Sequence, residues 1–214
     1  MRKGLLTALS GAVIASTTCS ALAMNQGELS TMVAQSADIP ADDAGKILEA
    51  FEGAIRSHLA AGHRVELRGF GSFSKGIAGV KTGRDPRTGM PITYTVYRRA
   101  TNLPEVGESQ LEQEIAQGTG ADRVAVGRVI DAYKGSVKSS LKKGGMVSLR
   151  GFGTYYVGRR SARSVRLPGS TQVVRIAAAR VPKYRASHTS AVGYKFVPAD
   201  ALKDAVNQVC GRVR

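Results

Sequence analysis

Tryptophan is absent from the 214-residue sequence, and aromatic residues make up only 6% of it. This scarcity argues against a protein that binds single strands by stacking bases on an aromatic platform. The only cysteines, Cys19 and Cys210, stand at opposite ends of the chain, so no disulfide framework or cysteine metal site is expected. Cys210 is most simply an incidental residue near the chain end, with an intermolecular disulfide as the alternative.

Histidine is also scarce, and the acids form no catalytic motif. The three histidines are His58, His63 and His188, and the first two are five positions apart, which does not place them on one helical face for a metal. The acids fall mainly on expected helices, without an H-E-x-x-H or D-x-D pattern. We therefore expect no catalytic residues, no metal and no cofactor. An enzyme is the first alternative class, for which metal-dependent DNA cleavage would be the test.

The first 23 residues contain no acid and differ from the rest of the chain. Arg2 and Lys3 precede an apolar and small-residue run over 5–15, and a Ser/Thr stretch then leads to Ala21-Leu22-Ala23. This pattern is typical of a cleavable export signal or an organelle transit peptide. It is too short to span a bilayer, and we expect no membrane association. The alternative is that Met24 is the true start.

A stretch of about thirty residues occurs twice, 82 positions apart. Residues 68–99 and 150–181 both open with Arg-Gly-Phe-Gly, carry an Arg-x-Pro near the middle and close with alternating β-type residues. Such a pattern predicts a long two-stranded ribbon with a proline at its tip. Similarity at a fixed offset without gaps predicts two tandem repeats.

The positive charge of the chain is concentrated in these two ribbons. Residues 68–99 and 150–185 together contain sixteen Lys or Arg and one acid, and the rest of the chain contains fifteen of each sign. The ribbons therefore account for the whole net charge of +15. A basic excess confined to two extended elements is typical of a surface that binds a polyanion. Two solvated loops that are basic by chance are the alternative, but such loops usually mix signs and rarely recur in register.

Two helices are expected before each ribbon. In the first copy Asn25 is a candidate N-cap of a helix that ends near Ser36, and a second helix starts near Pro40 and ends before Gly62. In the second copy Ser109 is the candidate cap. Helices with the apolar stripes seen here cannot bury them alone, so a partner surface is implied, and the other copy is the obvious candidate.

A short strand should follow each helix pair, at 65–67 and 147–149, before a Gly-Phe-Gly turn. Four aromatic residues at the ribbon roots have the spacing of core anchors, and we expect them to pack rather than to bind a ligand. They are Phe70, Phe73, Phe152 and Tyr155.

The order of helix, helix, Gly-Phe-Gly turn, basic ribbon, Arg-x-Pro tip and return strand resembles the bacterial HU and integration host factor family of histone-like DNA-bending proteins. Residues 83–89, GRDPRTG, are close to the family's GRNPQTG, and residues 176–182, IAAARVP, to its IAAANVP. Residues 196–207, FVPADALKDAVN, resemble its closing segment FVSGKALKDAVK. The resemblance implies an α+β fold with a helical body and two β-ribbon arms.

The sequence departs from the family pattern at several places. Asp85 replaces the tip asparagine and puts an acid where phosphate would approach, and the first copy lacks the closing helix. About a dozen extra residues, 183–195, are expected to form a surface loop that adds phosphate contacts. The expected organisation is a leader (1–23), a first repeat (24–100), a linker (101–107), a second repeat (108–207) with the insertion 183–195, and a tail (208–214).

The resemblance also implies a mechanism, in which two arms embrace double-stranded DNA in its minor groove and a proline at each tip, Pro86 or Pro168, wedges between base pairs. Sequence preference should be weak, with selectivity for bent, nicked or flexible DNA. The expected DNA-binding residues, which include both prolines, are Arg68, Lys75, Lys81, Arg84, Pro86, Arg87, Arg98, Arg99, Arg150, Arg159, Arg160, Arg163, Arg166, Pro168, Arg175 and Arg180.

The sequence allows two ways of pairing the repeats. One chain could supply both halves of the usual dimer as a pseudo-dimer, or two chains could pair copy with copy. RNA or ribosome binding is an alternative to DNA binding, because basic ribbons also suit contacts based on shape. The family implies a nucleoid-associated protein in a bacterial cytoplasm or an organelle, whereas the leader leaves export and binding of extracellular DNA open.

Overall fold

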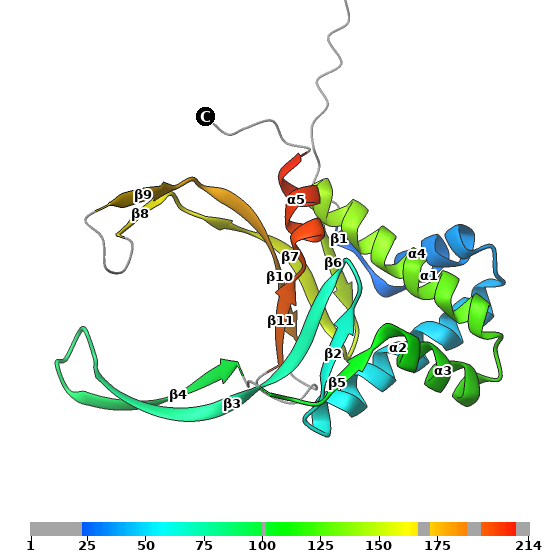
Figure 1. Cartoon of the computed structure of the whole chain (residues 1–214), viewed down its shortest axis with the longest axis horizontal. Helices are drawn as coiled ribbons and strands as arrows, with labels where there is room; N and C mark the ends of the chain where they lie inside the picture. Colours follow the sequence, from blue (N-terminus) through cyan, green and yellow to red (C-terminus); the bar gives the residue numbers. More distant parts are fainter. Residues whose placement is uncertain (1–22, 100–101, 167–171, 188–193, 209–214) are drawn as a thin grey trace, which may run out of the picture.

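The computed structural model describes residues 23–99, 102–166, 172–187 and 194–208. They form a helical body from which two β-ribbons project on the side away from the helices (Figure 1). We call residues 76–99 arm 1 and residues 158–181 arm 2. The expected α+β architecture is confirmed. The helices are α1 (Gln26–Ala37), α2 (Ala41–Ala60), α3 (Glu108–Thr119), α4 (Arg123–Lys142) and α5 (Asp200–Gln208).

The helix ends of the first repeat are set by local hydrogen bonds and turn residues. The Asn25 side chain accepts a hydrogen bond from the Glu28 N–H at 2.9 Å, and the Glu28 carboxylate accepts one from the Asn25 N–H at 3.0 Å. This capping box confirms Asn25 as the N-cap of α1. Pro40 precedes α2, and Gly62 takes a left-handed φ of 87° just after its C-cap, where glycine is favoured.

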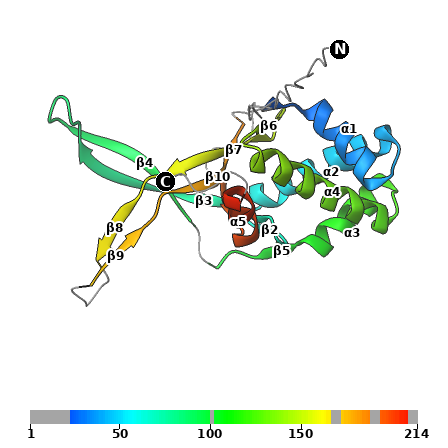
Figure 2. The same ribbon diagram turned by 90° about the horizontal axis from the view of Figure 1, so that it is seen from above.

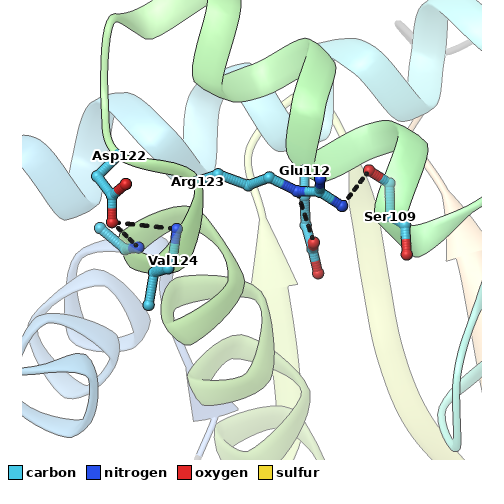
Figure 3. A network of polar contacts seen from close by, with 6 residues as sticks. Ser109, Glu112, Asp122, Arg123 and Val124 are labelled. Carbon is cyan, nitrogen blue, oxygen red and sulfur yellow. Dashed lines mark hydrogen bonds and ion pairs between the residues drawn. The ribbon is translucent and has the colours of Figure 1, made fainter.

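In the second repeat the expected cap is wrong, because Ser109 lies inside the first turn of α3. Gly107 is the N-cap: it ends a strand, and its extended backbone lets the helix begin at once. Asp122 caps α4 by accepting hydrogen bonds from the N–H groups of Val124 and Ala125, at 3.2 and 3.3 Å (Figure 3). Arg123 then ties α4 to α3, with its Nε 3.5 Å from the Glu112 carboxylate (Figure 3).

Two sheets underlie the arms. One has the order β1-β6-β7-β10, and the other has the order β11-β3-β2-β5, with β4 paired to β3 in arm 1. The strands β8 and β9 form the outer part of arm 2. Their bounds are β1 (Ala23–Met24), β2 (Arg64–Leu67), β3 (Gly71–Arg84), β4 (Pro91–Arg99), β5 (Glu105–Gly107), β6 (Met146–Leu149), β7 (Gly153–Arg160), β8 (Arg163–Arg166), β9 (Val173–Ile176), β10 (Ala179–Ala186) and β11 (Tyr194–Pro198).

The two repeats exchange short strands. The strand before α1, β1, pairs in parallel with β6 of the second repeat, and the strand before α3, β5, pairs in parallel with β2 of the first. The partners Ala23 and Met146 correspond, under the 82-residue offset, to Glu105 and Arg64. The structure therefore has an internal twofold relation in which each half contributes a strand to the other.

The expectation of a surface loop over 183–195 is wrong at both of its described ends. Residues 183–186 belong to β10, which pairs with β7, and residues 194–195 begin β11, which pairs with β3. Tyr184 lies opposite Tyr155, and Phe196 lies opposite Phe73. Since Phe73 and Tyr155 are equivalent under the offset, β10 and β11 fill equivalent places. The described ends of this stretch therefore contribute to two equivalent strands, β10 beside β7 of the second repeat and β11 beside β3 of the first.

A single hydrophobic core joins the two repeats. Phe51 packs edge-on against Tyr133 with ring centroids 5.3 Å apart, and Phe73 packs against Phe152 at 5.9 Å. The Tyr133 hydroxyl donates a hydrogen bond to the Tyr155 hydroxyl at 3.1 Å, which gives each buried hydroxyl a partner. The four root aromatics are all buried, so their expected packing role is confirmed. Of the helices in the described ranges, none combines the length and the apolar character needed to span a membrane.

Glu52 of α2 is the one acid among the buried side chains of the described residues, with 4% of its surface exposed. Burial is the main cause that raises its pKa to about 7, with a smaller contribution from Glu49 and an opposing one from Arg56. An acid with a raised pKa binds its proton more tightly in the folded state. It therefore reduces stability as the pH rises from its ordinary pKa through 7.

Replacing Gly71 by alanine should destabilise the protein. Gly71 has a φ of 153°, and a Cβ there would lie 2.5 Å from the Val197 carbonyl oxygen of β11. We expect a loss of about 2 kcal/mol or more in urea unfolding. The control is Gly53→Ala within α2, where a Cβ meets no atom within 4 Å and should add about 0.5 to 1 kcal/mol. Equal effects of the two changes would contradict the account of β11.

Replacing Glu52 by glutamine should stabilise the protein at pH 8 and change little at pH 5. The uncharged amide removes the cost of ionising a buried carboxyl, which amounts to at most about 3 kcal/mol for the pKa shift given above. Urea unfolding across this pH range measures the effect. Asp204→Asn on the exposed face of α5 is the control and should give no comparable rise with pH. If Glu52→Gln changed the free energy of unfolding equally at both pH values, ionisation of Glu52 would be excluded as the cause.

Candidate nucleic-acid interface

The two arms have the same strand register. In arm 1, β3 and β4 pair without interruption from Gly76 opposite Arg99 to Arg84 opposite Pro91. The pair Ala78 and Tyr97 corresponds, under the offset, to Arg160 and Ala179, which are partners in arm 2. The repeated sequence thus produces a repeated ribbon, and both ribbons leave the body in the same general direction (Figure 2).

Arm 2 differs from arm 1 in having two segments. The β7–β10 pairing ends at Arg160 and Ala179, and β8–β9 begins at Arg163 and Ile176. Two residues are skipped on each strand, so the register is kept without a bulge. Arm 2 therefore has an inner and an outer part, whereas arm 1 is one continuous ribbon (Figure 1).

The tip of arm 1 is held by Asp85. Its carboxylate accepts hydrogen bonds from the N–H groups of Arg87, at 2.8 Å, and Thr88, at 3.3 Å. The main chain closes the turn, because the Asp85 N–H donates to the Met90 carbonyl and its own carbonyl accepts from Gly89. This is the turn that Asp and Asn both favour. The carboxylate expected to face an approaching phosphate is thus bonded to the tip's own amides, and Pro86 is exposed beside it.

The predicted basic residues of arm 1 and its root lie on β3, at the tip and on β4. Lys75, Lys81, Arg84 and Arg87 have exposed side chains. Lys75 is at the root of the arm opposite Tyr194. In β4, Arg98 and Arg99 occupy positions opposite Ile77 and Gly76. Arm 1 therefore carries cations along its length and at its tip.

The predicted arginines of arm 2 are exposed in both of its segments. Arg159 and Arg160 end the inner segment, and the outer segment carries Arg163, Arg166 and Arg175. Arg163 lies opposite Ile176 in the outer ribbon. Pro168, the predicted wedge of this arm, lies outside the described residues.

Three predicted arginines are not on the free part of an arm. Arg68 and Arg150 lie in the Gly-Phe-Gly turns on the body, where both are exposed. Arg180 is half-buried, and its main chain forms two hydrogen bonds of 3.0 Å with the Asn207 amide. Its guanidinium lies against Gly144, at the C-terminal end of α4, where a cation is favoured. The main-chain bonds of Arg180 anchor the arm to the body, its Nη1 atom is buried without a hydrogen-bond partner in the described residues, and its contact with DNA stays a prediction.

Exposed apolar side chains on the arms were missed by the sequence analysis. Val80 is 74% exposed, and Ile92 and Tyr94 are 41% and 47% exposed. In arm 2, Val173 and Val174 are similarly exposed. A free ribbon has no core beneath it, so β-branched residues that form the strands must face solvent or a ligand. The alternating apolar pattern of these segments predicts a strand and could also have indicated this exposed apolar surface.

Two histidines that seemed unrelated in the sequence meet in the structure. The Nδ1 atoms of His58 and His63 are 3.2 Å apart, and His58 Nε2 is 2.7 Å from the Glu114 carboxylate. His63 lies beyond the end of α2, so the five-residue spacing does not keep them apart. Glu114 belongs to α3, and the cluster therefore joins the two repeats. Within the described ranges, no group of three or more His, Cys, Asp or Glu side chains, this cluster included, is arranged so that it could hold a metal ion.

Comparisons with known proteins identify the family of this chain. The family model described as bacterial DNA-binding protein matches residues 24–101 and again residues 106–191. DNA-binding protein HU-beta from Salmonella typhimurium and from Escherichia coli are each 43% identical over 102 residues, which is 48% of this chain and 100% of each relative. A solved structure, the Anabaena HU-DNA cocrystal structure, aligns over 39% of this chain and 91% of that one, with 25% identity and a TM-score of 0.38. The chain therefore belongs to the bacterial DNA-binding protein family of HU, and it contains two tandem copies of the family's unit.

Proposed function

We propose that this protein is an architectural DNA-binding protein whose two arms bend and compact double-stranded DNA. The observation that carries the proposal is the pair of arms in one register, projecting from one body and carrying the basic excess of the chain. Membership of a DNA-binding family supports the general role. The bending and its mechanism rest on the geometry of the arms.

Phosphate contacts supply most of the affinity in this proposal. The exposed cations of both arms replace counterions on the DNA, so binding weakens steeply as salt rises. The chain has 20 arginines and 11 lysines, and the planar guanidinium suits forked phosphate contacts and insertion into a narrow groove. Exposed Val80 and Ile92 on the same arm can cover sugar and base edges that contacts from lysine or arginine alone would leave exposed to solvent.

The tip prolines act as wedges. Pro86 is exposed on a turn that Asp85 stiffens, and a proline ring has no N–H group to leave unpaired between bases. Unstacking one base step costs a few kcal/mol, which the phosphate contacts along each arm offset. Pro168 takes the same part in arm 2 by its position in the repeat.

Recognition in this proposal depends on DNA shape and little on base sequence. The minor groove barely distinguishes A·T from T·A, and helices α1 to α4 bury their apolar faces in the body. DNA that is already bent, nicked or flexible is therefore preferred, because its deformation costs less. One chain supplies both arms, as an intramolecular pseudo-dimer, and acts on the nucleoid.

Replacing Pro86 by alanine should reduce the bend in a short duplex. The variant loses the wedge but keeps the cations, so we expect about half of the bend to be lost and affinity to fall less than tenfold. Fluorescence energy transfer between dyes on the duplex ends measures the angle. Pro168→Ala tests arm 2, and the double variant should bind a nearly straight duplex. An unchanged bend in the double variant would exclude the wedge, and tighter binding of structured RNA than of kinked DNA would favour an RNA-binding role.

Replacing Asp85 separates its charge from its hydrogen bonds. Asp85→Asn keeps an acceptor for the Arg87 and Thr88 amides and removes one negative charge, so we expect DNA binding to tighten about two- to fivefold at low salt. Asp85→Ala removes the same charge and also the two side-chain hydrogen bonds that stiffen the turn, so the DNA bend that it produces should be smaller than that of Asp85→Asn. Anisotropy titrations and the same energy-transfer assay measure both. Identical bends would show that the turn does not position Pro86.

A further inference from the structure

A partly buried ion cluster in the second repeat has a counterpart in the first repeat that lacks the cation. Lys134 of α4 is 14% exposed, and its ammonium lies 2.5 Å from the Glu108 carboxylate and 2.8 Å from that of Asp131. The amino group thus lies between two acids on α3 and α4. Under the 82-residue offset these three positions correspond to Glu52, Gln26 and Glu49. The first repeat therefore has a second carboxylate where the second repeat has its ammonium.

These residues of the first repeat line a pocket of about 500 Å³ between α1 and α2. Glu52 is 4% exposed and lines this pocket, and the hydrogen bond that it accepts from Arg56 goes to its main-chain carbonyl, which leaves its carboxylate facing the pocket. A buried carboxylate without a partner is costly, and the usual compensation is a cation. Leu29 and Leu48 supply apolar wall in the same pocket.

The surroundings of the pocket favour a cation, although the chain as a whole is basic. Residues 26–52 contain six acids and one base, Lys46, whereas the positive excess lies in the ribbons. Arg56, one turn further along α2, donates its Nε–H to the Glu52 main-chain carbonyl at 3.3 Å. Arg56 and Glu49 are the charged groups that act on the pKa of Glu52, and the tyrosines around it are neutral. Asp42 and Lys46 also line the pocket, and the Lys46 ammonium is paired with the Asp43 carboxylate at 3.3 Å.

We propose that this pocket binds a primary alkylammonium group, such as the end of a free polyamine, at the place that the Lys134 ammonium occupies in the other repeat. An ammonium has three donors, and Glu52, Glu49 and the Gln26 side-chain oxygen offer three acceptors. The alkyl chain lies along Leu29 and Leu48. The site is separate from the arms, so it does not depend on the proposed DNA bending.

The site should depend on pH. Burial raises the pKa of Glu52 to about 7, and only the ionised carboxylate attracts an ammonium. Alkylammonium groups stay charged throughout this range. Affinity should therefore rise by roughly tenfold between pH 6 and pH 8.

Calorimetric titration of the full chain without DNA tests the proposal, with spermidine and n-butylamine as probes at constant ionic strength. We expect one site, at least tenfold weaker binding in Glu52→Gln, and no binding in Glu52→Lys, whose own amino group would fill the pocket as Lys134 does. Tetramethylammonium, which has no N–H donor, should not compete. Equal binding of spermidine by the parent protein and Glu52→Gln, or no binding of either amine at millimolar concentration, would overturn the site.

Asp38→Asn is the matched control, since it removes one charge from the same acidic region and Asp38 does not line the pocket. Its affinity should stay within twofold, and a tenfold loss would show diffuse attraction rather than a site. Light scattering distinguishes the source of the ammonium. Binding of one amine to a monomeric protein supports a free amine as the ligand. Self-association of the parent protein that butylamine reverses, and that Glu52→Gln does not show, would overturn this proposal and assign the pocket to a lysine of a second copy. DNA bending by Glu52→Gln should be unchanged.

Discussion

The antiparallel pairing of β11 with β3 is the contact on which the rest of the structure depends. The first repeat runs from β4 into the linker and has no third strand of its own beside the root of β3. An open edge there would leave the ladder of β3 unpaired and Phe73 uncovered. β11 closes this edge from the far end of the chain and places Phe196 4.8 Å from Phe73 and 5.5 Å from Phe70. The root of arm 1 is therefore fixed by residues about 120 positions away in the sequence.

This closure makes the two repeats one folding unit. Aromatic rings from both repeats interlock, and each half lends a strand to the other through β1 and β5. Neither half could bury its apolar face alone, and joining them in one chain holds them at a high effective concentration. The rigid root also sets the direction of both arms. Two free ribbons can act together on one DNA duplex only if the body holds the roots of the ribbons at a fixed distance and orientation.

Local signals predicted local structure, and long-range pairing explains what they missed. Asn25 was predictable as a cap because its partner is three residues away, and the arms were predictable from alternating residues and an Arg-x-Pro tip. Ser109 was a wrong cap because Gly107 belongs to a strand whose partner, β2, is about forty residues earlier. The strands inside 183–195 could not be foreseen, since their partners lie in different repeats. Arg180 matches an arm residue in sequence, and only the structure shows that its guanidinium lies against Gly144 on the body.

Joining two copies in one chain allows equivalent positions to differ, and this protein uses that freedom in its body as well as its arms. His58, His63 and Glu114 form a cluster at one junction of the repeats, where the equivalent positions hold Ser140, Gly145 and Met32. The same applies to Glu52 and Lys134. In a symmetric homodimer, a glutamate there would place a buried carboxylate in both halves, and each would carry the full desolvation cost. In a fused pair, the acids of the second repeat can be neutralised by Lys134 while the first repeat keeps Glu52 at the equivalent position. Covalent linkage thus permits a site in one half of the molecule only, whereas a symmetric homodimer would have to carry the same residues in both halves.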